Sequence, residues 1–171
     1  MNQNLSGRLA RAGKRRCAIT AHHQRIGYKV MSITFHPRPG MVLICDFNTG
    51  FKAPEMIKRR PVVVISPRPR RSNQLCTVVP LSTTVPNPVE PFHHRMDPQS
   101  LPGRLAGKET WAKCDMLSTV SLERLDRVII GRDRWGKRIY AARGVTTDDM
   151  GAIRRAVLFA LGMPMTSSVS A

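Results

Sequence analysis

Hydrophobic residues in this chain fall into short runs separated by turns that contain Pro and Gly, and only the last run has a helical period. Runs of β-branched residues predict two neighbouring strands at Pro61–Ile65 and Cys76–Leu81, because Val and Ile pack well on a pleated surface. A first strand is predicted at Met41–Phe47, after a turn at Pro37–Gly40. A basic loop, Pro67–Gln74, is expected to join the two central strands.

The segment Glu109–Met116 alternates between apolar and polar residues, which predicts a further strand. The side chains expected to face the core are Ala112, Cys114 and Met116. Those expected on the opposite side are Trp111, Lys113 and Asp115. Because Lys113 and Asp115 are two residues apart, they would share one face of this strand. Shorter strand-like pieces are predicted near 91–94, 117–120, 125–130 and 139–142, with a charged turn at 131–137.

The last regular element is predicted to be a helix. Thr146 and Thr147 are N-cap candidates, and Asp148 and Asp149 suit the positive end of the helix dipole. Gly162 and Pro164 are expected to end it. One apolar stripe is made by Met150, Ile153, Val157, Leu158 and Leu161. Several short strands and one terminal helix predict a mainly β (β plus α) fold, a small, strongly bent β-barrel with a C-terminal α-helix.

The first 30 residues differ from the rest, since they hold seven Lys or Arg and no acidic residue. Such a segment buries too little apolar surface to offset its ordering entropy. We therefore expect a basic, disordered N-terminal extension at 1–34, a single domain at 35–163 and a short polar tail at 164–171. Other interpretations are a nucleic-acid-binding arm, a targeting peptide that lacks an apolar core, or a translation start at Met31 instead of Met1.

Charge points to the class of partner. The 171 residues include 28 Lys or Arg and 11 Asp or Glu, which gives a formal net charge of +17. This excess favours a polyanion, because cationic side chains that neutralise phosphates release counterions. Charge of this kind is also found in proteins that only bind RNA or DNA, so it indicates no reaction.

The sequence gives no sign of a metal centre, a cofactor or a membrane span. Its cysteines are widely spaced, with no C-x-x-C pair: Cys17, Cys45, Cys76 and Cys114. Free thiols and the lack of a secretory signal favour the cytoplasm. His93 and His94 are adjacent, but no second ligand pair follows at the spacing of a zinc site. No apolar run approaches the ~18 residues that a membrane helix needs.

The two central strands are flanked by groups that suit a phosphate. Arg59 and Arg60 stand at the start of the first strand, and Ser82, Thr83 and Thr84 follow the second. Guanidinium and hydroxyl groups brought together in this way can bind phosphate oxygens. The alternative is a hairpin whose ends are simply solvated.

Four stretches in order resemble the PemK/MazF family of type II toxin–antitoxin toxins: PRPGMVLICDF at 37–47, the Arg-Pro strand at 60–64, Val-Pro-Leu-Ser-Thr at 79–83 and Lys-Cys-Asp at 113–115. The resemblance covers about residues 35–162. It implies an SH3-like barrel, usually a homodimer, that cuts single-stranded RNA without a metal. It also implies a cognate antitoxin, acidic and partly disordered, as partner.

The chemistry that the resemblance implies is attack by a ribose 2′-OH on the adjacent phosphate, which leaves a 2′,3′-cyclic phosphate and a 5′-OH. Asp115 is then the candidate base, and Arg60 matches the catalytic Arg that binds the phosphate. Ser82 stands where the family has Thr, and Lys113 stands where it has an Arg that acts as acid or stabiliser. Further candidates for RNA binding are Glu55, Lys58, Arg59, Arg68, Arg70, Thr83 and Trp111.

Each of these assignments has a structural alternative. Asp115 and Lys113 would otherwise form an exposed cross-strand ion pair, and Ser82 would only stabilise a turn. Two other functions also stay open. One is a non-catalytic nucleic-acid-binding barrel. The other is a gyrase-poison-like toxin, because a family of gyrase inhibitors shares the fold, and a fold alone does not fix function.

Overall fold

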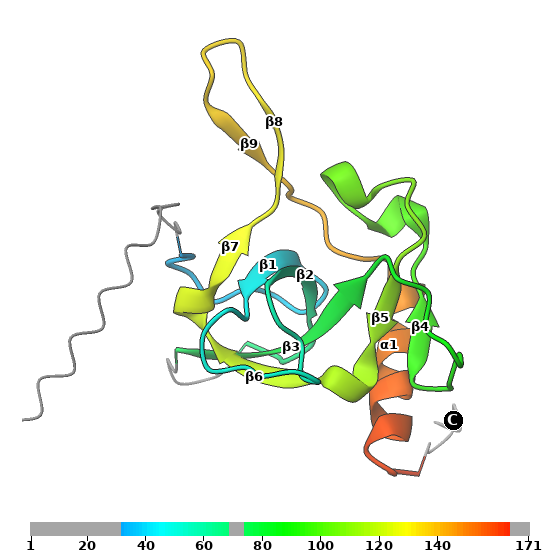
Figure 1. The fold of residues 1–171 in the computed structure, drawn as a ribbon. Helices are drawn as coiled ribbons and strands as arrows, with labels where there is room; N and C mark the ends of the chain where they lie inside the picture. Colours follow the sequence, from blue (N-terminus) through cyan, green and yellow to red (C-terminus); the bar gives the residue numbers. More distant parts are fainter. Residues whose placement is uncertain (1–31, 69–73, 165–171) are drawn as a thin grey trace, which may run out of the picture.

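The computed structural model describes residues 32–68 and 74–164. The predicted N-terminal extension and polar tail therefore lie almost entirely outside the described residues, as does Arg70. Within them, the chain forms a bent antiparallel sheet, a separate two-stranded hairpin and one α-helix beside the sheet (Figure 1). No helix in these two ranges is both long and apolar enough to cross a membrane.

Seven strands make up the sheet: β1 Val42–Asp46, β2 Arg59–Val64, β3 Leu75–Ser82, β4 His93–Arg95, β5 Trp111–Lys113, β6 Ser118–Ser121 and β7 Leu125–Arg127. Their order is β4-β5-β3-β2-β1-β7, with β6 also paired to β3. Strand β3 holds two parts of the sheet together, because its first residues pair with β6 and its last two pair with β5. The three strands with the longest apolar runs were predicted within two residues at each end.

The fold is mainly β with a C-terminal α-helix, as predicted, but the described strands do not close into a barrel. No ladder joins β7 at one edge to β4 or β6 at the other. After β7 the chain leaves the sheet and forms a hairpin of its own from β8 (Ile129–Arg132) and β9 (Arg138–Tyr140). The predicted small, strongly bent barrel is therefore present as an open, bent sheet in the described part of the chain.

Both faces of the central strands are buried, which explains their continuous apolar sequence. Val63 and Val79 point into one cluster, which includes Ile153 of the helix. Val62 and Val78 point into a second cluster on the other face. Because neighbours on a strand alternate between these clusters, each residue at the strand ends is assigned to one face or the other.

The helix α1, Thr147–Ala160, covers the first cluster beside β4 and β5 (Figure 1). Thr146 is its N-cap, and the Thr146 hydroxyl accepts a hydrogen bond from the Asp149 amide at 3.2 Å. Gly162, with φ +68°, follows its end as predicted. Leu161 was predicted in the buried stripe but is 58% exposed, because it lies beyond the last helical turn.

The predicted strand at 109–116 is only partly correct. Strand β5 ends at Lys113, and the 3-10 turn η3, Cys114–Met116, follows. Ala112 and Cys114 are buried as predicted, whereas Met116 is half-buried. The Cys114 thiol contacts the Ile153 carbonyl at 3.8 Å, so the chain turns toward the helix here. Asp115 therefore projects from a turn and does not share a strand face with Lys113.

Three more 3-10 turns complete the described chain: η1 Pro98–Ser100, η2 Gly103–Leu105 and η4 Leu122–Arg124.

Candidate functional site

Arg60 and Ser82 stand at neighbouring ends of two paired strands. The β2–β3 ladder pairs Val63 with Val79 and ends at the pair Val62 and Pro80. The same register, continued by two residues, puts Ser82 opposite Arg60. Residues two apart on a strand share a face, so both side chains lie on the face of Val62.

Strand β5 adds two predicted residues to this face. Trp111 pairs with Ser82 in the β3–β5 ladder, and Lys113 lies two residues further along β5. Ala112 between them is fully buried in the opposite cluster. Three neighbouring strands thus place Arg60, Ser82, Trp111 and Lys113 on one face, which we call the strand-end face.

Asp115 and Glu55 line one open groove. The long loop between β1 and β2 supplies Phe51, Pro54, Glu55 and Met56, and the η3 turn and the start of β6 supply Asp115, Met116, Leu117 and Ser118. The Glu55 Oε2 atom accepts a hydrogen bond from the Lys52 amide at 2.6 Å, which fixes the loop turn. The structure therefore brings together the two carboxylates predicted for the site.

Asp115 has a neighbour that the sequence did not reveal. The Nε2 atom of His93 lies 3.9 Å from its Oδ1 atom, with the His93 side chain 8% exposed and that of Asp115 39% exposed. His93 stands opposite Lys113 in the β4–β5 ladder. The ion pair between Asp115 and Lys113, the structural alternative to a catalytic role, is not among the ion pairs of the described residues, whereas the contact with His93 is.

The tautomer of His93 follows from its other nitrogen. The Nδ1 atom accepts a hydrogen bond from the Glu90 amide at 3.0 Å, so the proton of the neutral ring sits on Nε2 and faces Asp115. Burial lowers the pKa of His93 below its ordinary value, Lys113 acts in the same direction, and Asp115 and Glu90 act against it. His93 is therefore a neutral N–H donor aimed toward the Asp115 carboxylate.

Trp111 carries a buried polar atom with no acceptor. Its Nε1 atom has no hydrogen-bond partner among the described residues. A buried donor left unpaired costs about 1–3 kcal/mol. Trp111 pairs with Ser82 in the β3–β5 ladder, and its Nε1–H is a buried donor that no described residue satisfies.

The backbone before Arg60 is unusual. Lys58 has φ +74° and is the only residue other than Gly with positive φ in the described ranges. Its carbonyl accepts a hydrogen bond from the Phe47 amide at 3.1 Å, which closes the base of the β1–β2 loop. The Arg60 Nε atom donates to the Ile57 carbonyl at 3.4 Å, so this guanidinium is held near the same loop.

Two of the arginines predicted to bind RNA lie away from the strand-end face. Arg59, next to Arg60 on β2, points to the opposite face and pairs with Asp126 at 3.2 Å. It lines a different groove together with Ile44 and Pro61. Arg68 follows the other end of β2 and lines a third groove, with His36 and Arg38.

The hydroxyl residues after β3 have separate roles. Ser82 is buried, and its Oγ atom accepts a hydrogen bond from the Thr84 amide at 3.1 Å, as the turn interpretation expects. The hydroxyl proton is still free to be donated to a ligand. Thr83 is exposed at the turn itself.

The described cysteines carry no reactive thiol. Burial raises the pKa of Cys45 and Cys114 to about 12 and also raises that of Cys76. These thiols are therefore protonated at neutral pH and poor nucleophiles. Across residues 32–68 and 74–164, no three His, Cys, Asp or Glu side chains converge as metal ligands would.

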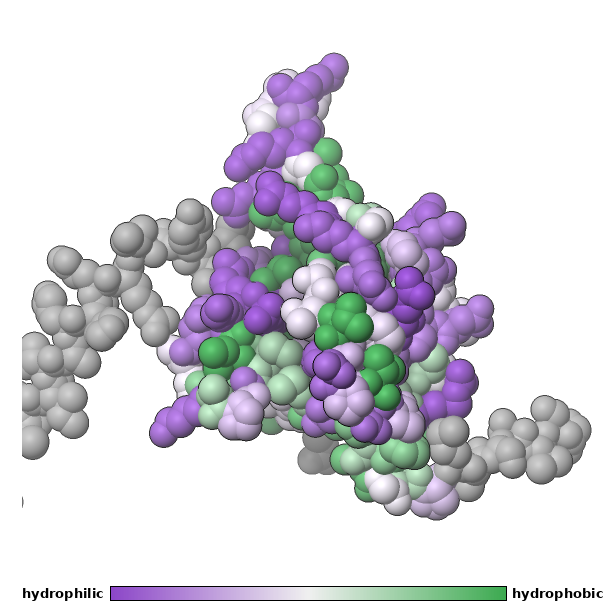
Figure 2. All heavy atoms as spheres, turned by 45° about the vertical axis from the view of Figure 1, so that its right-hand side comes forward, coloured by the Kyte–Doolittle hydropathy of each residue, from purple (hydrophilic) through white to green (hydrophobic). Residues whose placement is uncertain are grey.

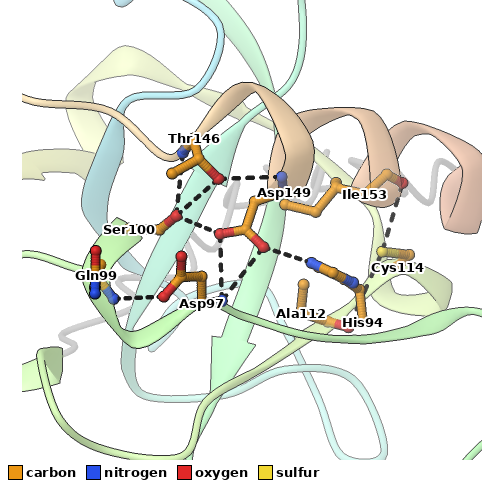
Figure 3. Close-up of polar contacts among 9 residues, drawn as sticks. All are labelled: His94, Asp97, Gln99, Ser100, Ala112, Cys114, Thr146, Asp149 and Ile153. Carbon is orange, nitrogen blue, oxygen red and sulfur yellow. Dashed lines mark hydrogen bonds and ion pairs between the residues drawn. The ribbon is translucent and has the colours of Figure 1, made fainter.

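A second polar cluster joins the start of α1 to the segment after β4 (Figure 3). The Asp149 carboxylate accepts from Ser100 and lies 2.7 Å from His94 Nε2. The Ser100 Oγ atom in turn accepts from the Thr146 amide at 3.1 Å. Asp149 was expected only to face the helix dipole, but it is buried here.

The three residue types of a hydrolytic triad are present in this cluster, but in the wrong order. The Asp lies between the Ser and the His, so the imidazole cannot take the Ser proton. The cluster fixes the helix to the sheet. It also explains the adjacent histidines, because alternation along β4 sends His94 toward the helix and His93 toward Asp115.

Comparisons with known proteins identify the family. The sequence model of PemK-like, MazF-like toxins of type II toxin–antitoxin systems matches residues 38–161. The chain belongs to this family. The resemblance drawn from four short stretches is thus confirmed. No curated protein is similar enough in sequence to this toxin to count as a relative.

Solved structures share the toxin's fold. An endoribonuclease from a mycobacterial species is 23% identical, with a TM-score of 0.52 over 75% of this chain and 94% of that one. A mycobacterial endoribonuclease in complex with its cognate antitoxin is also 23% identical, with a TM-score of 0.53 over 76% and 99%. MazF from Deinococcus radiodurans is 18% identical, with a TM-score of 0.50 over 75% and 99%.

Proposed function

We propose that this toxin is an endoribonuclease that cuts single-stranded RNA through the ribose 2′-OH, without a metal ion or cofactor. The observation that carries the proposal is the placement of Arg60, Ser82, Trp111 and Lys113 on one face of neighbouring strands, with Asp115 two residues after Lys113. The names of the mycobacterial neighbours support the reaction class.

The chemistry requires a base, an acid and cationic or hydrogen-bonding groups around the phosphate. Asp115 takes the proton from the 2′-OH as this oxygen attacks phosphorus. Lys113 gives a proton to the 5′ oxygen as the P–O5′ bond breaks. The products are a 2′,3′-cyclic phosphate and a 5′-OH, and the proton count balances within the two side chains.

Charge that develops on the phosphorane oxygens is met by this chain's own donors. The Arg60 guanidinium offers a planar fork that matches two phosphate oxygens. Ser82 and Trp111 are paired in the β3–β5 ladder, and the Trp111 Nε1 atom has no partner among the described residues. These groups are held by strands before RNA arrives, which is how preorganised donors stabilise a transition state.

We infer that His93 acts through Asp115 and is a positioning residue. At 3.9 Å the Nε2–H group is too far for a hydrogen bond to the carboxylate, but a contact of this kind tightens in a substrate complex. The Glu90 amide holds the imidazole in the tautomer that this contact needs.

Lys113 differs from the Arg implied by the family resemblance. An ammonium does not offer the planar fork of a guanidinium, but it releases a proton more readily. This difference in chemistry favours the role of acid over that of a bidentate phosphate clamp.

A cognate antitoxin is the proposed inhibitor, since a mycobacterial neighbour was solved with its own antitoxin. We expect the antitoxin to have an acidic, partly disordered segment that becomes ordered when it binds the cationic toxin. The toxin itself is proposed to act as a homodimer in the cytoplasm. Opposite charges predict that this binding weakens steeply with salt.

The test is a long RNA incubated with the toxin in EDTA, with both new ends mapped. Cuts that carry cyclic phosphate and 5′-OH ends are expected, and RNA with a 2′-O-methyl group at the cut nucleotide should bind but survive. RNA that is bound but never cut would favour the non-catalytic barrel. Intact RNA with blocked supercoiling would favour the gyrase-poison-like toxin.

A further inference from the structure

The β8–β9 hairpin projects away from the rest of the molecule (Figure 1). It forms a sheet of its own with no ladder to the main sheet, and an isolated two-stranded hairpin is at best marginally stable in water. Its base is held by specific contacts. The Arg127 guanidinium lies 3.7 Å from the centroid of the Tyr140 ring, and the Ala141 amide donates to the Val128 carbonyl at 2.9 Å.

The tip of the hairpin is an ordered turn. The Asp133 Oδ1 atom accepts from the amides of Trp135 and Lys137, both at 2.9 Å. The Arg132 Nη1 atom donates to the Gly136 carbonyl at 2.7 Å, and Gly136 has the positive φ, +79°, that the turn needs. These contacts order the backbone of the turn from which the tip side chains project.

The side chain presented at this tip is a tryptophan. Trp135 is 75% exposed, more than any other large hydrophobic residue in the described ranges. The Arg134 guanidinium lies 4.0 Å from the centroid of its ring. The ring is thus displayed to solvent at the end of the projecting hairpin, where its flat face is accessible to a partner.

Charge selects the kind of partner. From Ile129 to Arg143 the hairpin carries Arg132, Arg134, Lys137, Arg138 and Arg143 against a single acid, Asp133. One oxygen of that acid already serves two turn amides. Figure 2 shows the projecting part mostly in hydrophilic colours, with hydrophobic atoms toward its base. Aromatic rings placed among cations are the means by which proteins bind single-stranded nucleic acid, with bases stacked and phosphates neutralised.

A second copy of the chain fits less well. The half-exposed Ile129, Ile130 and Ile139 would suit a protein surface. However, two copies that met through this hairpin would bring its five cations against each other. RNA matches both the charge of the hairpin and its exposed ring.

We propose that the β8–β9 hairpin is an RNA-binding arm, in which Trp135 stacks on a base and the neighbouring cations contact phosphates outside the cleavage groove. This inference rests on the proposed function in one respect only, namely that single-stranded RNA is the substrate. It does not depend on which residues carry out the cleavage.

The experiment measures binding of fully 2′-O-methylated single-stranded RNA by fluorescence anisotropy, with a long oligonucleotide and a matched duplex. Trp135→Ala should weaken binding of the long single strand about 5- to 150-fold, because stacking on an aromatic side chain contributes roughly 1–3 kcal/mol per base. Trp135→Phe should retain most of the affinity. Phe159→Ala, which removes a 50% exposed ring from α1, is the control and should bind as the wild type does.

Three results would contradict the proposal that the hairpin is an RNA-binding arm. The first is wild-type affinity in Trp135→Ala. The second is an equal loss of affinity for single strand and duplex, which would mean that the hairpin contributes only non-specific charge. The third is a change in oligomeric state in Trp135→Ala, which would make the hairpin a contact between copies. Because this RNA cannot be cut through a 2′-OH, a toxin that fails the end-mapping test still gives a clear answer here.

Discussion

The Nε2 atom of His93 lies 3.9 Å from Oδ1 of Asp115, and His93 stands opposite Lys113 in the β4–β5 ladder. One buried imidazole thus lies beside both the proposed base and the proposed acid. Its Nδ1 atom is occupied by the Glu90 amide, so the only ring proton of the neutral form faces the carboxylate.

The first prediction concerns this contact. His93→Asn removes the Nε2 donor, whereas His93→Gln can place an amide N–H near the same point. We expect kcat to fall about 10- to 100-fold in His93→Asn with little change in KM, because a misplaced base slows the reaction more than it weakens binding. His93→Gln should recover part of the rate. If both variants lose only melting temperature and keep kcat, His93 is structural.

The second prediction is a pH dependence of stability. Burial lowers the pKa of folded His93 below 6.5, so between these two values the unfolded chain binds a proton that the folded chain does not. The free energy of unfolding should therefore fall as the pH falls through 6.5 toward the lowered pKa. Asp115 and Glu90 reduce the effect and Lys113 adds to it, but burial dominates.

Chemical denaturation from about pH 7 to about pH 5.5 measures this slope. His93→Gln lacks the titrating group and should show a shallower slope than the wild type, whatever its absolute stability. Identical slopes in the two proteins would mean that His93 is protonated as easily in the fold as in the unfolded chain.

The third prediction uses two neighbouring arginines as a matched pair. Arg60 lies on the strand-end face, whereas Arg59 points to the other face and pairs with Asp126. Arg60→Ala should lower kcat/KM about 10- to 150-fold, since a hydrogen bond to a charged group contributes about 1.5–3 kcal/mol. Arg59→Ala should keep its cleavage rate and lose at most about 1 kcal/mol of stability. Equal losses of activity would show that net charge, and not the strand-end face, is what matters.

Part of this structure could be predicted from the sequence, because buried elements have a distinct pattern of apolar residues. Strands β2 and β3 are buried on both faces, so their Val-rich runs stand out. The helix is predicted from the Thr146 cap, the apolar stripe of Met150, Ile153 and Val157, and Gly162 after its end. These signals are local, and tertiary contacts only reinforce them.

The errors lie where tertiary contacts decide. The alternation at 109–116 fits a strand, but Cys114 packs against the Ile153 carbonyl and turns the chain, which moves Asp115 off the strand. His93 reaches Asp115 only through the register of β4 on β5, and residues 96–110 separate these two strands along the chain. The projection of the β8–β9 hairpin likewise depends on what the main sheet leaves unpaired.

The central claim is that Asp115, beside the strand-end face, is the base of a 2′-OH cleavage reaction. The most direct test is the single-turnover cleavage rate of Asp115→Asn on a target RNA, with binding of the same RNA measured in parallel. General base assistance is typically worth ~10²–10⁴-fold, so the rate should fall by that factor, while binding persists because a negative charge near the phosphate has been removed. Cleavage at the wild-type rate would contradict the account and make Glu55, on the same groove, the next base to test.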